Sequence, residues 1–559
     1  MLSRSAKRSL WVLGAIVCHF ILGQWYINIH SATFDEPMYI AAGASLWRSG
    51  DARMDQDNPA LAKLLVSAPL LFQKLTVPWD TREWRGGYHY AFGERLLYFS
   101  GNDADRILLC ARSVGLVLSG LLGLLLWRFA RHAWGELPAG LCLVFYCFSP
   151  TLLAHAALAT NDFLAVFFSV LGLMACLSFL ERPEPGAALG VAAASLAAFL
   201  CKYSAILLWP AYVLLFLRAW AAGEIEGRPR LRSFTAYAVL PWLAGAAAYL
   251  ALCPGGWEGV ATRLWQVTAG EHPSFLLGRV SKSGWLWYYA AAFLLKSTLP
   301  ELAVAAGGIW LLVRKRTALS AKAWMPAVVV LLYLAAASVS RKQIGVRYVL
   351  LVYPMLALLA AVSADALARR FRYGKQAAVL LGAGQLLAAV ACAPHFLAYF
   401  NPLAGGPAGG YKVLVDSNLD WGQELKALAA FHRSEGEPEV VLSYFGTASP
   451  EYHGIRAQQV LSTNSKQRRL RNSQSPEKEW LVVSATNLQG AYFGPDTLAW
   501  LKDMRPIRRI GHGLFVYDIT GDAPAHRRLA EVYAAMGDAS LASWERGRAY
   551  LLSSGTAGP

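Results

Sequence analysis

The 559-residue sequence predicts a polytopic α-helical membrane protein that carries a small α/β domain at its C-terminus. Three observations support this class. Hydrophobic residues make up 56% of the chain and charged residues only 16%, whereas soluble domains average about 25% charged residues. Apolar stretches of roughly 20 residues recur up to residue 395, and a helix needs that length to cross about 30 Å of hydrocarbon. After residue 400 the pattern changes to short β-like runs between turn-rich segments.

Eleven apolar stretches are predicted to cross the membrane. The fifth stretch is short and joins the sixth through Lys202, which indicates a distorted or half-buried helix. No small-residue cleavage site follows the first stretch before Trp25, so we interpret it as a retained anchor and not as a signal peptide. The stretches lie near residues 10–28, 107–127, 139–158, 163–180, 187–201, 204–221, 235–252, 297–313, 324–339, 347–363 and 376–395.

The placement of basic residues predicts the orientation of the chain. Cytoplasmic loops are enriched in Lys and Arg, and with eleven crossings and a cytoplasmic N-terminus all five basic clusters fall on the cytoplasmic side. The same parity places residues 29–105 and everything after about residue 396 outside the cytoplasm. The clusters are Arg4–Arg8, Arg128/Arg131, Arg228/Arg230/Arg232, Arg314–Arg316 and Arg369–Lys375.

Two domains follow from this pattern, a membrane domain over residues 1–398 and an α/β domain over residues 399–559. The first outer loop, residues 29–105, is too long for a plain connection and too polar to span, so we expect amphipathic helices along the membrane surface. The C-terminal domain is expected to end in a helical hairpin that is broken at Gly537. Its predicted strands lie at residues 440–445, 480–484 and 514–519.

Charge, cysteine usage and missing motifs exclude several classes of function. The net charge of +16 belongs to the membrane part, because residues 1–399 hold 35 basic and 20 acidic residues and residues 400–559 hold 17 and 16. We therefore expect no nucleic-acid partner. The eight cysteines lie in or beside apolar stretches and predict no disulfide framework. No P-loop and no GxGxxG in a βαβ context occurs, which argues against a nucleotide-sugar donor.

Acidic residues stand at two places where apolar stretches end on the outer side. Asp35 and Glu36 follow the first stretch, where charges are costly unless they are solvated or used. Asp162 stands between the third and fourth stretches. Two interpretations stay open for each place. Asp35 caps a helix that begins at Pro37, or it has a chemical role; likewise, Asp162 caps a tight turn, or it belongs to a site.

Cations on the outer side run against the usual distribution of charge. Lys63 ends the segment Asn58-Pro-Ala-Leu-Ala-Lys, and three further cations lie where predicted spans meet the outer side, namely Lys202, Lys296 and Arg347. Snorkelling of a long side chain explains each one singly. Together they indicate an anionic ligand at the outer leaflet.

A lipid-linked phosphosugar needs both kinds of group. Cations stabilise a phosphate as it leaves. A phosphate monoester has a second pKa of about 6, so it leaves the sugar without a general acid. The hydroxyl or amine that accepts the sugar needs a base, and a partly buried aspartate serves that purpose.

These residues resemble the motifs of the GT-C superfamily of integral-membrane glycosyltransferases, especially bacterial relatives of protein O-mannosyltransferases and lipid A aminoarabinose transferases. The resemblance covers roughly residues 10–400. Asp35–Glu36 is similar to the family's first-loop acidic motif and Asp162 to its second-loop acid. The segment Asn58–Lys63 is similar to His-Pro-Pro-Leu-x-Lys, with Asn58 in place of His and Ala60 in place of the second Pro.

The resemblance implies a polyprenyl-phosphate-sugar-dependent glycosyltransferase of the bacterial inner membrane, working on the periplasmic face with inversion. It implies that Asp35 is the base and that Glu36 and Asp162 orient the acceptor or the sugar. The acceptor is a protein, a lipid or a glycan. No cofactor and no metal ligand is expected, although a divalent cation stays open. The residues at family positions for the lipid phosphate are Lys63, Lys202, Lys296, Arg347 and Tyr348.

The segment Asp416-Ser-Asn-Leu-Asp-Trp-Gly-Gln-Glu resembles a bacterial subgroup of these proteins. Asp420 and Trp421 are expected, with Asn58, to contact the acceptor or the sugar; alternatively Trp421 only docks the C-terminal domain. Two other functions stay open. A transporter of a lipid-linked sugar would use the carboxylates as a proton relay, although no inverted repeats are visible. A scaffold would bind partners through the C-terminal helices.

Overall fold

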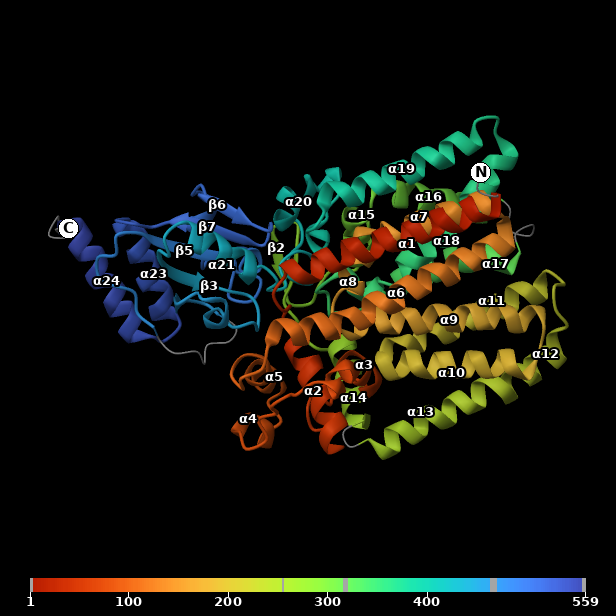
Figure 1. Ribbon diagram of the computed structural model, residues 1–559, viewed down its shortest axis with the longest axis horizontal. Helices are drawn as coiled ribbons and strands as arrows, with labels where there is room; N and C mark the ends of the chain where they lie inside the picture. The colour runs from red at the N-terminus through yellow and green to blue at the C-terminus, as the bar shows by residue number, and fades with distance from the viewer. Residues whose placement is uncertain (1–3, 254–255, 315–319, 463–469, 555–559) are drawn as a thin grey trace.

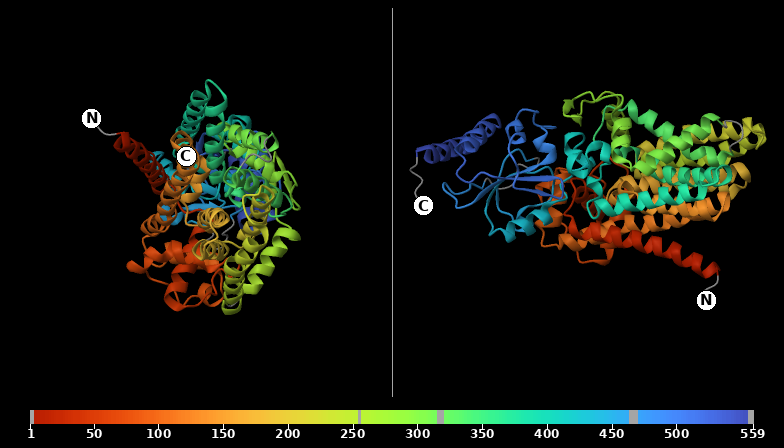
Figure 2. Two further views of the ribbon diagram at one scale, coloured as in Figure 1. Left: turned by 90° about the vertical axis from the view of Figure 1, so that its right-hand side faces the viewer. Right: turned by 90° about the horizontal axis from the view of Figure 1, so that it is seen from above.

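A computed structural model describes residues 4–253, 256–314, 320–462 and 470–554. The molecule is elongated, with a bundle of long helices in one half and a sheet-containing domain in the other (Figure 1). The right-hand view in Figure 2 places the start of the first helix at the end of the bundle that is remote from the C-terminal domain. The predicted class, a helical membrane protein with a C-terminal α/β domain, is confirmed.

The described residues contain eight helices long and apolar enough to cross a membrane, or nine if one bent pair counts as a span. In that pair, α7 (Glu136–Cys147) and α8 (Pro150–Ala156) meet at 58°, and Pro150 begins the second helix. The predicted spans at 187–201 and 297–313 correspond to the shorter apolar helices α10 (Pro185–Cys201) and α16 (Leu299–Arg314). The eleven predicted stretches are therefore all helical, but two fall short of a full span by length.

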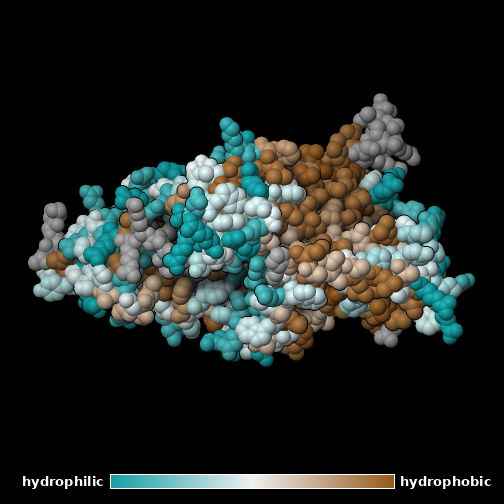
Figure 3. Space-filling view, turned by 90° about the horizontal axis from the view of Figure 1, so that it is seen from below, coloured by the Kyte–Doolittle hydropathy of each residue, from teal (hydrophilic) through white to brown (hydrophobic). Residues whose placement is uncertain are grey.

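The remaining long helices are bounded where polar or turn-forming residues interrupt the apolar runs. Side chains on their outer faces are apolar and exposed, as lipid contact requires, for example Leu13 and Ile21 or Leu380 and Leu387. Figure 3 shows these hydrophobic side chains gathered over the helical half. The helices are α1 (Arg4–Ile29), α6 (Ala104–Trp134), α9 (Asn161–Glu181), α11 (Leu208–Ala221), α12 (Gly227–Phe234), α13 (Leu240–Leu252), α17 (Ala321–Ser338), α18 (Val352–Arg370) and α19 (Gly374–Cys392).

The first loop folds into short helices against the end of the bundle that lies next to the C-terminal domain. Helix α2 packs closely on α3. A Cβ at Gly43 would lie only 2.0 Å from the carbonyl oxygen of Lys63, so this approach needs a residue without a side chain. This close approach fixes the direction in which the loop leaves α1. The helices of the loop are α2 (Glu36–Ser49), α3 (Ala60–Ser67), α4 (Arg82–Arg85) and α5 (His89–Tyr98). Between later spans lie α14 (Gly256–Thr268) and α15 (Tyr288–Lys296).

The C-terminal domain is built on a five-stranded sheet with the order β4-β3-β5-β7-β6. Strands β4, β3 and β5 are parallel, whereas β7 is antiparallel to both β5 and β6. The strands are β3 (Glu439–Ser443), β4 (Ala457–Gln459), β5 (Glu479–Ser484), β6 (Arg508–Ile510) and β7 (Leu514–Asp518). Helix α21 (Leu425–Ser434) precedes the sheet, and the hairpin α23 (Ala523–Ala535) and α24 (Ala539–Ser554) follows it.

A buried ion-pair network fastens the hairpin to the sheet. Arg548 on α24 donates to both carboxylate oxygens of Glu479 on β5, and His526 on α23 lies 2.7 Å from Glu545. The Arg548 and Glu479 side chains are at most 1% exposed. Removing one partner leaves the other as an uncompensated buried charge.

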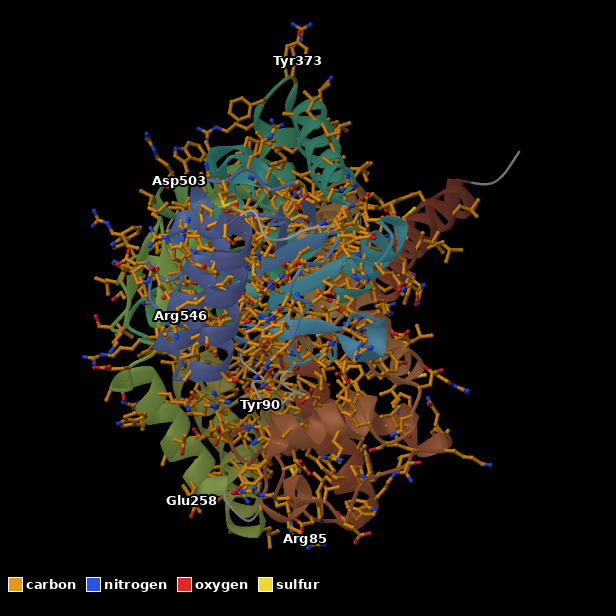
Figure 4. All side chains as sticks on the ribbon, turned by 90° about the vertical axis from the view of Figure 1, so that its left-hand side faces the viewer. Arg85, Tyr90, Glu258, Tyr373, Asp503 and Arg546 are labelled. Carbon is orange, nitrogen blue, oxygen red and sulfur yellow. The ribbon has the colours of Figure 1, made fainter. Side chains whose placement is uncertain are left out.

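We therefore expect Arg548→Ala to destabilise the hairpin by about 3–5 kcal/mol. Proteolysis of the full-length protein in increasing urea, followed at the hairpin, measures this change. The matched control is Arg546→Ala on the same helix, whose side chain is exposed (Figure 4) and should change the stability by less than about 0.5 kcal/mol. Equal urea midpoints for the two variants would contradict the prediction.

Candidate functional site

A cavity of about 890 Å³ lies where the first loop, the neighbouring ends of the membrane helices and the C-terminal domain meet. Many of the residues that line it are apolar, among them Phe199, Ile206, Leu207 and Leu264. Charged groups line it as well. The charged residues that line it are Asp35, Asp162, Lys202, Arg263, Lys342, Arg347 and Asp416.

Asp35 directs its carboxylate into this cavity. Its backbone stands at the start of α2, but its side chain makes no capping hydrogen bond. The carboxylate instead accepts from Nη1 of Arg347 at 2.9 Å and from the hydroxyl of Tyr90 at 3.4 Å. The carboxylate of Asp35 therefore does not cap the helix, which was one of the two interpretations of this residue.

Backbone hydrogen bonds hold the segment before Asp35 against the C-terminal domain. The N–H of Phe34 donates to the carbonyl of Trp421 at 2.8 Å, and the Thr447 hydroxyl donates to the carbonyl of Phe34 at 2.7 Å. The position of Asp35 therefore depends on the docked domain as well as on the first loop.

Arg347 joins the two acidic places that are separate in the sequence. The same Nη1 lies 2.9 Å from Asp35 and 3.6 Å from Asp162. The guanidinium carbon stands 4.2 Å from the centre of the Trp421 ring, in a cation–π geometry. Its Nε is buried and has no hydrogen-bond partner among the described residues.

Lys202 forms the second contact of Asp162. Its Nζ lies 2.5 Å from Oδ1 of Asp162 and 4.4 Å from the centre of the Tyr348 ring. Asp162 therefore takes part in a network of ions and does not merely cap a turn. This network brings together four residues that were predicted to belong to the site, Asp35, Asp162, Lys202 and Arg347.

Two further cations on the wall were not identified from the sequence. Arg263 on α14 donates to the side-chain oxygen of Asn58 at 2.9 Å, and Lys342 donates to Gln266 at 3.1 Å. Burial, followed by the charges of Arg263 and Arg347, lowers the pKa of Lys342 to about 7. Both residues also line an adjoining polar cavity of about 320 Å³, together with Asp55, Asp57, His89 and His272.

Asp416 adds a carboxylate from the C-terminal domain. It has a left-handed backbone, with φ of 59°, and its carboxylate accepts a hydrogen bond from Tyr492. Burial raises the pKa of Asp416, and the bonds from Tyr492 and the charge of Arg347 only partly oppose this. Asp416 belongs to the segment that resembles a bacterial subgroup, but the sequence predicted no role for this residue.

Glu36, next to Asp35, has a structural environment. Arg112 donates to its two oxygens at 2.8 and 2.6 Å, and the N–H groups of Thr33 and Ala159 donate at 2.8 and 2.9 Å. Although burial raises the pKa of Glu36, the Arg112 charge and these hydrogen bonds outweigh it and hold the pKa below its usual value. Glu36 does not line the cavity and fixes the loop that presents Asp35.

Three other predicted residues lie beside the cavity without lining it. Nζ of Lys63 donates to the carbonyls of Asp55 and Asn58 at 2.6 and 2.8 Å. Nζ of Lys296 donates to the carbonyls of Leu397 and Asn418 at 2.7 and 2.6 Å. Asp420 accepts from the N–H of Thr486 at 3.0 Å, and burial raises its pKa to about 7. Asn58, Tyr348 and Trp421 do line the cavity.

Residues 99–254 match the family described as dolichyl-phosphate-mannose-protein mannosyltransferase. The match agrees with the predicted resemblance of the chain to integral-membrane glycosyltransferases. No curated protein matches the chain.

Among solved structures, the chain is similar to ArnT from Cupriavidus metallidurans bound to undecaprenyl phosphate. The identity is 14% and the TM-score 0.47, over 91% of this chain and 98% of that one. It is also similar to the oligosaccharyltransferase AglB from Archaeoglobus fulgidus in complex with an inhibitory peptide and a dolichol-phosphate. There the identity is 10% and the TM-score 0.46, over 89% of this chain and 72% of that one.

Proposed function

We propose that this protein transfers a sugar from a polyprenyl-phosphate donor to an acceptor, with Asp35 as the base. The observation that carries this proposal is the geometry of Arg347, which lies between the carboxylates of Asp35 and Asp162 in a cavity that both charged and apolar side chains line. A lipid-linked phosphosugar has an anionic head and an apolar chain, for which such a lining offers both kinds of contact.

The cations would bind the phosphate of the donor. Lys202, Arg263, Lys342 and Arg347 all face the cavity. The phosphodiester of the donor carries one negative charge, and the phosphate that leaves carries nearly two. Fixed cations therefore stabilise the transition state more than the bound donor, which is what accelerates the reaction. Lys63 and Lys296, which bind backbone carbonyls, would support this wall from behind.

The acceptor would lose its proton to Asp35. Its hydroxyl or amine attacks the anomeric carbon from the side opposite the phosphate, while the bond from that carbon to the phosphate oxygen breaks. The proton goes to the carboxylate and the electron pair of the broken bond to the phosphate, so a single displacement inverts the anomeric centre. Asp162 holds Lys202 and Arg347 in place.

The first test is a donor assay. Purified protein in lipid is incubated with a panel of polyprenyl-phosphate sugars, with and without candidate acceptors, and the release of free polyprenyl phosphate is measured. Release that depends on the protein is the expected result. Movement of intact donor across the bilayer without any release of sugar would overturn the proposal in favour of a transporter.

Donor binding should weaken as the pH rises from about 6 to 8. Lys342 has a pKa of about 7, so it is charged at the lower pH and neutral at the higher one, whereas the donor phosphodiester does not titrate in this range. Lys342→Gln should lower the affinity at pH 6 and leave it nearly unchanged at pH 8. Identical pH dependence in the variant and the original protein would contradict this role for Lys342.

The proposal includes an orientation, with the basic clusters in the cytoplasm and the C-terminal domain in the periplasm of a bacterium. Alkaline phosphatase fused after residue 559 should then be active, and green fluorescent protein at the same place should stay dark when exported unfolded. Fluorescent cells without phosphatase activity would show that the C-terminal domain lies in the cytoplasm, opposite to the proposed orientation.

A further inference from the structure

Three side chains that commonly bind metal ions meet outside the cavity. His30 follows α1, His395 follows α19, and Glu424 precedes α21 of the C-terminal domain. Oε1 of Glu424 lies 3.7 Å from Nε2 of His30 and 3.8 Å from Nδ1 of His395. The three ligand-type atoms all lie within 4.8 Å of one another. We call these residues the His30–His395–Glu424 cluster.

The cluster contains polar atoms whose burial is not compensated. His30 is 1% exposed and Glu424 is 2% exposed. Nδ1 of His395 and Oε2 of Glu424 have no hydrogen-bond partner among the described residues. An unsatisfied buried polar atom typically costs about 1–3 kcal/mol. Such a cost is tolerated where a ligand supplies the missing contact.

The tautomer of His30 suits a metal ligand. Its Nδ1 lies 2.9 Å from the carbonyl oxygen of Tyr26, which accepts only, so Nδ1 carries the proton. The lone pair of Nε2 then points toward Glu424. A ring nitrogen that donates to a backbone carbonyl while the other binds the ion is the usual arrangement of a histidine ligand.

We propose that the His30–His395–Glu424 cluster binds a divalent zinc ion that joins the C-terminal domain to the membrane part. Two imidazoles and a carboxylate are zinc ligands, and around a tetrahedral Zn²⁺ such atoms stand about 3.4 Å apart. Contraction of the two distances to Glu424 by a few tenths of an ångström reaches this spacing. The fourth ligand is water or His512, whose ring centre lies 5.7 Å from that of His395.

The turn between β6 and β7 is shaped to approach the cluster. A Cβ at Gly511 would lie 1.9 Å from Oε2 of Glu424, and the backbone φ of Gly511 is 54°. Glycine therefore lets this turn, which carries His512, lie directly on the carboxylate.

Zinc at this place would hold in position the backbone that presents the cavity residues. The N–H of Ser31, next to His30, donates to the carbonyl of Gln423, next to Glu424, at 3.0 Å. Asp35 and Trp421 lie a few residues further along these two segments. The ion would act as a positioning element and not in the reaction, so the inference does not rest on the proposed function.

Metal analysis of the purified full-length protein, with any affinity tag removed, tests the proposal. We expect about one Zn²⁺ per chain after dialysis. Glu424→Gln, which keeps the shape of the side chain, and His30→Gln should each lose it. The matched control is His453→Gln, a histidine of the same domain that lies outside the cluster and should retain the zinc.

A second measurement guards against variants that fail to fold. After chelation, addition of Zn²⁺ should raise the melting temperature of the original protein and of His453→Gln, but not that of Glu424→Gln. Co²⁺ in place of zinc should give the visible absorption of a four-coordinate site. Equal zinc content in the original protein and Glu424→Gln, or no response to either ion, would overturn the proposal.

Discussion

Asp35→Asn is expected to lower the rate of sugar transfer by about 10²–10⁴-fold while donor binding persists. Asparagine has nearly the same shape, and its one oxygen still accepts from Arg347 while its amide nitrogen takes the place of the oxygen beside Tyr90, but the amide does not accept the proton of the acceptor. The loss should therefore appear in the turnover number and not in the affinity for the donor. Single-turnover assays with saturating donor separate the two quantities.

The matched control for Asp35→Asn is Asp80→Asn in the same loop, whose side chain is exposed and does not line the cavity. It should leave the turnover number unchanged. If the turnover number of Asp35→Asn were within a factor of two of that of the original protein, Asp35 would not be the base.

Arg347→Met is expected to lower transfer by about 10²–10³-fold and also to weaken donor binding. The substitution keeps much of the side-chain volume over Trp421, but it leaves Asp35 and Asp162 facing each other without the shared cation. Two effects then act together, the loss of a positive charge at the phosphate and repulsion between the donor and the carboxylate of Asp35, whereas Asp162 keeps its contact with Lys202.

Arg347→Lys supplies the comparison for this prediction. Lysine restores the charge but not the planar group that reaches two carboxylates and stacks on an indole, so an intermediate rate is expected. If the Lys and Met variants were equally active, and both close to the original protein, Arg347 would not contribute to phosphate binding.

The membrane fold was predictable because lipid imposes a strong pattern on sequence. A span needs a long run without charges, and the bent pair α7–α8 and the short helices α10 and α16 still show that run. Span length was harder to predict, since α10 ends at Cys201 where the chain turns extended at Lys202. Three of the five strands were predictable as short β-like runs between turn-rich segments, whereas the strand order of the sheet depends on contacts between distant segments.

The candidate site was predictable only where a charge stands out against its surroundings. Asp35, Asp162, Lys202 and Arg347 interrupt apolar stretches and come together at the cavity. Lys63 and Lys296 give the same signal, but their Nζ atoms satisfy backbone carbonyls, and sequence does not reveal where a carbonyl lacks a partner.

Other residues gave no signal in the sequence. Arg263 and Lys342 lie in polar segments between predicted spans, where a basic residue does not stand out from its neighbours in the sequence. His30, His395 and Glu424 share no short spacing, so only the folded chain brings them together. The roles of all these residues in binding or reaction stay predictions.

The backbone contacts from Phe34 to Trp421 and from Ser31 to Gln423 have a consequence for the order in which the protein is made. Ribosomes deliver the chain from its N-terminus, so the first loop and the membrane helices emerge before the residues that complete the cavity wall, Asp416, Trp421 and Tyr492. A chain that stalls after its last membrane helix would be inserted in the bilayer yet lack one side of its cavity. The cavity would thus be complete only once the chain has been made as far as Tyr492, and, on the proposed function, a shorter chain would not consume lipid carrier.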